Sequence, residues 1–218
     1  MAAAEAPSAA AVAALRTALR RPVPAALSRW AEELADASAD TSLLGTSLRA
    51  PRYEALLWNG ARVPGCALAV TGVLTAEPHR TVADLGRAVT AGAAVVAAAG
   101  AAAPGPLTAS LDTLGCAVVA ALLGPLGGAR LDDVIDMAAS LMVLGAPQAP
   151  IGAERLQLLR AGHPVASGWL AGRAVAAGIA PLRGGAETTL TTVAGAPLDP
   201  VPEPAPDEPI GHLLASLR

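Results

Sequence analysis

The chain has 218 residues, enough for one domain with a substantial core. Apolar residues make up 53% of it, much of that alanine, with no Phe, one Tyr and three Trp. Small side chains let helix axes approach closely, whereas strands favour aromatic and β-branched residues. The composition therefore predicts an all-α fold, a compact helical bundle, and argues against a β-sandwich.

The charge distribution argues against a nucleic-acid partner. The formal net charge is −3, and the densest basic group, Arg16, Arg20 and Arg21, fits a solvated helix face better than a binding stripe. Every basic residue of the chain is Arg, so lysine is excluded as a base or as a Schiff-base former.

In the first part of the chain, prolines, glycines and cap residues mark the ends of the predicted helices. These are 9–20, 24–39 and 50–58, followed by 64–75 as either a short helix or an apolar turn. Leu27, Trp30, Ala31 and Leu34 recur at helical spacing. Asn59-Gly60 is predicted to stop the third helix.

In the second part, Thr81 and Asp84 form a start similar to a capping box. The helices predicted here are 82–102, 109–124, 132–145, 152–162 and 164–178, the last two broken at Gly162-His163-Pro164. We expect a helical domain over 1–184. Residues 185–218 are predicted to be a proline-rich, extended tail with a short terminal helix at 210–217.

Targeting and metal signals are weak. The N-terminus lacks a basic segment ahead of its apolar run, so we expect no secretory signal and a cytoplasmic protein. Residues 88–104 approach membrane-span length but are rich in Ala and Gly, so no membrane span is predicted. Cys66 and Cys116 are expected to be buried apolar side chains, and no metal site or cofactor is predicted.

Four stretches in order resemble the MmgE/PrpD family, which includes 2-methylcitrate dehydratase and cis-aconitate decarboxylase. They are PAALSRWAEELADASADTSLLG (24–45), ALLWNGARVPG (55–65), GPLTASLDTLGCAVVAALLGPLGGARLDDVIDMAAS (105–140) and QLLRAGHPVASGWLAGRAVAAGIAP (157–181). The resemblance implies the family's helical domain. The chain ends about where the family's α/β lid domain would begin, so we expect that domain to be missing.

The departures from the family pattern remove its chemistry. After the Asn-Gly segment the family has His-x-x-Asp-x-Asp-Asp, whereas residues 64–70 here read PGCALAV. The family's entry histidine aligns with Pro106, although Thr108 is kept, and its substrate-contacting Lys and His align with Gln157 and Arg160. Dehydration or decarboxylation of a tricarboxylate needs cations and a proton-transfer group. The ancestral reaction is therefore not expected.

A few residues could still do chemistry or bind a ligand. His163, Asp112 and His79 are the candidate catalytic residues, each with a structural alternative as a loop or cap residue, and His212 is expected to be solvated. The candidate ligand-binding residues around the former substrate turn are Trp58, Asn59, Cys66, Thr108 and Gln157.

Two functions compete, and a membrane-associated helical protein is kept as a third only because of residues 88–104. The first is a non-catalytic module, a pseudoenzyme that forms a homo-oligomer or pairs with a full-length family member. The alternative is a repurposed lyase, isomerase or cyclase of specialised metabolism that binds an apolar small molecule. Whether the protein is an enzyme is left open by the sequence.

Overall fold

The computed structural model describes residues 6–102, 108–143 and 154–194, and within these ranges the regular secondary structure is almost entirely helical. The helices are α1 (Ala6–Leu19), α2 (Ala25–Leu34), α3 (Arg52–Arg62), α4 (Ala67–Thr75), α5 (Val82–Ala102), α6 (Thr108–Leu123), α7 (Leu131–Ser140), α8 (Glu154–Ala176) and α9 (Gly185–Ala194). Two short strands, β1 (Thr41–Ser42) and β2 (Arg49–Ala50), pair antiparallel between α2 and α3. The prediction of an all-α fold is confirmed.

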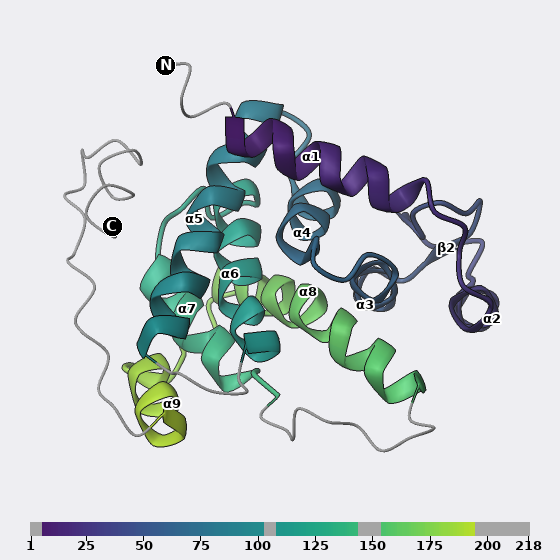
Figure 1. Cartoon of the computed structure of the whole chain (residues 1–218). Helices are drawn as coiled ribbons and strands as arrows, with labels where there is room; N and C mark the ends of the chain where they lie inside the picture. The colour runs from purple at the N-terminus through teal and green to yellow at the C-terminus, as the bar shows by residue number, and fades with distance from the viewer. Residues whose placement is uncertain (1–5, 103–107, 144–153, 195–218) are drawn as a thin grey trace.

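Helix α6 is the centre of the bundle. It packs against α4, α5, α7 and α8, and nearly all of its residues from Leu111 to Leu123 are buried. Figure 1 shows α6 between α5 and α8, with α2 and the strands at one end of the molecule and α9 at the other. Gly168 of α8 lies against Cys116 and Gly172 lies against Ala120, so α6 and α8 run in the same direction.

Glycines make the closest helix crossings possible. A Cβ on Gly162 of α8 would lie 1.8 Å from the carbonyl oxygen of Leu57 in α3, and a Cβ on Gly60 would lie 2.8 Å from a methyl of Val165. At the crossing of α5 and α6, a Cβ on Gly92 would lie 2.7 Å from the carbonyl oxygen of Gly115. Backbone therefore meets backbone at these crossings.

The expectation that Asn59-Gly60 ends a helix is wrong, because α3 continues to Arg62. Gly60 is needed for the contact with α8, and the Asn59 side chain bonds back to the carbonyl of Ala55 one turn earlier. Asn-Gly pairs often end helices, but here both residues lie inside α3 and contribute to its packing.

The predicted break at Gly162-His163-Pro164 is also absent, because α8 is one helix with Pro164 inside it. A proline within a helix removes one backbone hydrogen bond. Val165 and Ala166, which follow it, are fully buried, and α8 packs on both α3 and α6. This burial offsets the loss and keeps the helix continuous.

Residues 64–75, for which the sequence allows a short helix or an apolar turn, form α4 from Ala67 onward. The start predicted for α5 is confirmed: the Asp84 carboxylate accepts from the Thr81 N–H at 2.7 Å, and the Thr81 hydroxyl accepts from the Asp84 N–H at 3.1 Å. Two predicted helices end earlier than expected, α2 at Leu34 and α7 at Ser140.

The predicted domain boundary at residue 184 is too early. Helix α9 follows directly, and its Ala186 and Leu190 are buried in the cluster that holds Val134 and Ala138 of α7. The Asp136 carboxylate of α7 accepts from the backbone N–H groups of Gly184 and Ala186, which caps the start of α9. The helical body extends to Ala194, and the remainder of the predicted tail lies outside the described residues.

We predict that Gly162→Ala lowers the free energy of unfolding by more than about 2 kcal/mol, because α3 and α8 must separate to admit the methyl group. Gly172→Ala in the same helix is the matched control, since its Cβ would meet nothing closer than 3.8 Å. The control should stabilise the protein by about 0.5–1 kcal/mol through helix propensity. Urea unfolding of both variants measures the difference, and equal effects would contradict the close crossing.

Candidate functional site

Two of the candidate ligand-binding residues, Trp58 and Asn59, lie inside the core. Trp58 and Asn59 are both 0% exposed. The Trp58 indole N–H donates to the Leu27 carbonyl at 2.9 Å, which ties α3 to α2. The Asn59 amide accepts from the Leu44 N–H at 2.7 Å and donates to the Ser42 carbonyl at 2.9 Å, which ties α3 to the strands. Their hydrogen bonds are used within the fold, so neither side chain is open to a ligand.

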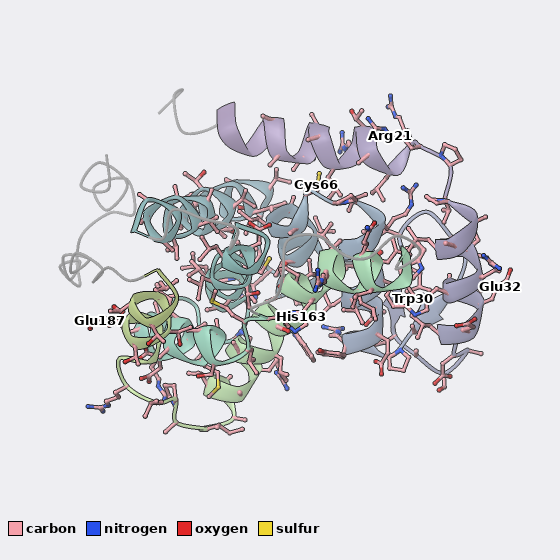
Figure 2. The ribbon with its side chains drawn as sticks, turned by 60° about the horizontal axis from the view of Figure 1, so that its bottom comes forward. Arg21, Trp30, Glu32, Cys66, His163 and Glu187 are labelled. Atoms are coloured by element: carbon pink, nitrogen blue, oxygen red, sulfur yellow. The ribbon has the colours of Figure 1, made fainter. Side chains whose placement is uncertain are left out.

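The two cysteines lie in one apolar cluster with Leu56, Val70 and Val165. Cys116 is fully buried, and burial raises the pKa of its thiol to about 12, with the Thr71 hydroxyl acting in the opposite direction. Cys66, just before α4, is half-buried, and burial raises the pKa of its thiol as well. In Figure 2, Cys66 lies under α1. Both thiols are therefore disfavoured as nucleophiles.

His163 and Asp112 are half-buried and lie within helices. His163 is on α8, and its ring nitrogen Nε2 lies 3.0 Å from the hydroxyl of Ser167 one turn later (Figure 2). Burial lowers the pKa of His163 and raises that of Asp112. The structural alternative of a loop or cap residue is wrong for Asp112, because it lies in the second turn of α6.

The remaining candidate site residues do not lie with His163 and Asp112 in a common site. His79 and Gln157 are exposed, and neither lines the cleft described below. Thr108 is the first residue of α6, and its side chain, like all of His212, lies outside the described residues. No group of three or more His, Cys, Asp or Glu side chains able to hold a metal occurs in the part of the chain that the structure describes.

A polar cleft of about 370 Å³ lies at the carboxyl ends of α4 and α6, beside α8 and the start of α3. It is lined by Asp40, Arg52, Thr75, Glu77, Ala120, Gly124, Pro125, Leu126, Trp169, Gly172 and Arg173. Small-molecule sites commonly measure ~300–1,000 Å³. This cleft is at the lower end of that range, and no His, Cys or Ser is among its described lining residues.

Part of the cleft's polar surface is already paired. Arg52 forms an ion pair with Asp40 at 3.3 Å and donates to the Thr41 hydroxyl at 3.1 Å. The Thr75 hydroxyl donates to the Thr71 carbonyl at 2.7 Å. By contrast, the side chains of Glu77, Trp169 and Arg173 have no hydrogen-bond or ion-pair partner in the described structure, and Trp169 and Arg173 are one helical turn apart on α8.

Sequence reasoning missed this cleft because no local motif marks it. Its lining comes from segments between residues 40 and 173, brought together by the packing of α3, α4, α6 and α8. It also missed Arg62, which is 6% exposed and donates from Nη2 to the Arg21 carbonyl beyond the end of α1. A cation near helix carbonyl ends is favourable, so Arg62 joins α3 to α1.

Comparisons with known proteins add no relative: no family model, curated protein or solved structure matches the chain.

We predict that Asn59→Ala lowers the free energy of unfolding by about 3 kcal/mol, because the Leu44 N–H and the Ser42 carbonyl lose their partner. The control is Gln157→Ala, an exposed residue also expected from the sequence to bind a ligand, which should change stability by less than about 0.5 kcal/mol. Chemical denaturation compares the two variants. A loss for Asn59→Ala as small as that of the control would count against its structural role.

The lowered pKa of His163 predicts a loss of stability in mild acid. The unfolded chain binds a proton here more readily than the folded protein, so stability falls as the pH drops below about 6.5 toward the lowered folded pKa. Asp112 changes stability with pH in the opposite direction. Its pKa is raised by burial, so its protonation at low pH favours the folded state. The stability of wild type relative to His163→Asn should therefore decrease between about pH 7 and pH 5, as measured by urea unfolding. A constant difference would contradict the effect of burial on His163.

Proposed function

We propose that this protein is a non-catalytic helical module of the MmgE/PrpD kind that associates with a second copy of itself. The observation that carries the first half of this proposal is the burial of Trp58 and Asn59. The segment that resembles the family's substrate turn here holds α2, the strands and α3 together. A substrate could reach it only by dismantling that packing.

The alternative, a repurposed lyase, isomerase or cyclase, finds less support. Proton transfer needs a group with a tuned pKa within reach of a bound substrate. His163 and Asp112 have shifted pKa values, but neither lines the cleft. Among its described lining residues the cleft offers no histidine, thiol or serine, and its carboxylates are Asp40, which is paired with Arg52, and Glu77. A binding role accounts for these features better than catalysis.

Helix α5 supplies the surface for association. Its stretch Val82–Ala101 is the one helix among the described residues that is long and apolar enough to cross a membrane, and only 28% of its apolar 18-residue window is buried. Ala93, Ala97 and Ala101 are exposed at four-residue intervals and so share one face. We call these three residues the α5 alanine face.

A second copy of the chain fits this face. No charged side chain follows Arg87 within α5, so two α5 alanine faces can meet without opposing like charges. Alanine loses almost no side-chain entropy on burial and lets two helices come close together. A pair of such helices would cover the apolar surface that the bundle leaves open. The acidic net charge gives no support for a nucleic-acid partner.

We predict that the protein is dimeric and that Ala97→Arg makes it monomeric, because a guanidinium on the α5 alanine face would be buried without a partner. Size-exclusion chromatography with light scattering measures the mass. Ala176→Arg, at an exposed position at the end of α8, is the matched control and should leave the dimer intact.

A monomeric wild-type protein would overturn the association. Partition of the wild-type protein into the membrane fraction would overturn it as well, since α5 would then be covered by lipid. Turnover of any substrate that depends on His163 would favour the repurposed enzyme.

A further inference from the structure

The polar cleft has a charge pattern that the proposed self-association does not use. Its walls include a half-buried indole, Trp169, beside the apolar Ala120, Pro125 and Leu126. These residues offer a surface for an apolar group of a ligand. The charged residues of the lining are the groups that a polar or charged part of a ligand would contact.

One carboxylate and one guanidinium in the cleft have no partner within the described structure. Arg52 and Asp40 neutralise each other at 3.3 Å. Glu77 and Arg173 line the same cleft and have no partner among the described residues. A ligand with one anionic and one cationic group could therefore pair with both Arg173 and Glu77. A dianion would be repelled by the Glu77 carboxylate, and a dication would be repelled by the Arg173 guanidinium.

The surroundings of Glu77 favour an ammonium group there. The Glu77 N–H donates to the Leu123 carbonyl at 3.0 Å, which fixes this residue at the carboxyl end of α6. Arg80 binds the same end through the carbonyls of Leu123 and Gly124 at 3.3 and 3.4 Å. The negative end of a helix attracts positive charge, and Arg80 already supplies one such charge here. The ammonium group of a ligand is therefore assigned to the Glu77 carboxylate itself, which lines the cleft.

The surroundings of Arg173 favour a carboxylate. Arg173 lies one turn after Trp169 on α8, so its guanidinium and the indole share one face of the helix. A guanidinium binds a carboxylate through paired hydrogen bonds, and the Trp169 indole lines the same cleft.

We propose that this cleft binds a free α-amino acid, with its carboxylate on Arg173, its ammonium group on Glu77 and its side chain against Trp169. The volume of about 370 Å³ suits a ligand of this size. The proposal does not depend on the α5 alanine face, so either one can fail without the other.

The test begins with thermal unfolding of the full-length protein in the presence of each common amino acid at millimolar concentration. A ligand that binds only the folded state raises Tm. Calorimetry then gives the Kd of the best amino acid, of its N-acetyl derivative and of its carboxamide. We expect each blocked derivative to bind about tenfold more weakly or worse, because each loses one charge-assisted contact.

Two variants assign the contacts. Arg173→Gln should weaken binding of the amino acid about tenfold but leave binding of the carboxamide unchanged, since the carboxamide has no carboxylate to lose. Glu77→Gln should weaken binding of the amino acid and leave binding of the N-acetyl derivative unchanged. Arg183→Gln and Glu187→Gln, both exposed and outside the cleft, are the charge-matched controls and should bind like wild type.

Circular dichroism and Tm without ligand establish that each variant is folded, as expected for partly or fully exposed residues. The proposal is overturned if no amino acid raises Tm, if the blocked derivatives bind as tightly as the free amino acid, or if the two cleft variants bind no more weakly than their controls.

Discussion

The close approach of helix backbones is the constraint on which this structure depends. With no Phe and few other aromatic residues, the core has little large side-chain volume with which to fill gaps between helices. The gaps are closed by moving the helices together, and Gly60, Gly92, Gly115, Gly162 and Gly168 mark where they touch. Because each contact involves backbone on at least one side, it tolerates no added methyl group. The few large side chains, Trp58 above all, join the outer elements to this centre.

The same packing explains the role of the segment around residues 57–70. Asn59 and Gly60 look like a turn in the sequence, yet one holds the strands and the other admits α8. The residues after them form α4, whose Ala69, Val70 and Thr71 are buried. In this structure the segment therefore has a structural role. The ligand-accessible polar groups lie instead at the carboxyl ends of α4 and α6.

The sequence predicted the helical class and most helix positions, because apolar spacing and caps such as Thr81 are local signals. It failed at Asn59-Gly60 and at Pro164, where tertiary burial outweighs a local tendency to end a helix. It also failed at α9, whose start is capped by Asp136, a residue far away in the chain. The cleft could not be predicted for the same reason, since Glu77 and Arg173 come to line one cleft only after folding.

The crossing of α3 and α8 joins residues 60 and 162, which are separated by most of the domain. Contacts between such distant segments slow the folding of small proteins, and helical bundles usually avoid them. During synthesis, α3 leaves the ribosome long before α8 exists, with the face around Gly60 still uncovered. This protein should therefore fold late and slowly for an all-helical chain, and its N-terminal half should need α8 before it becomes stable.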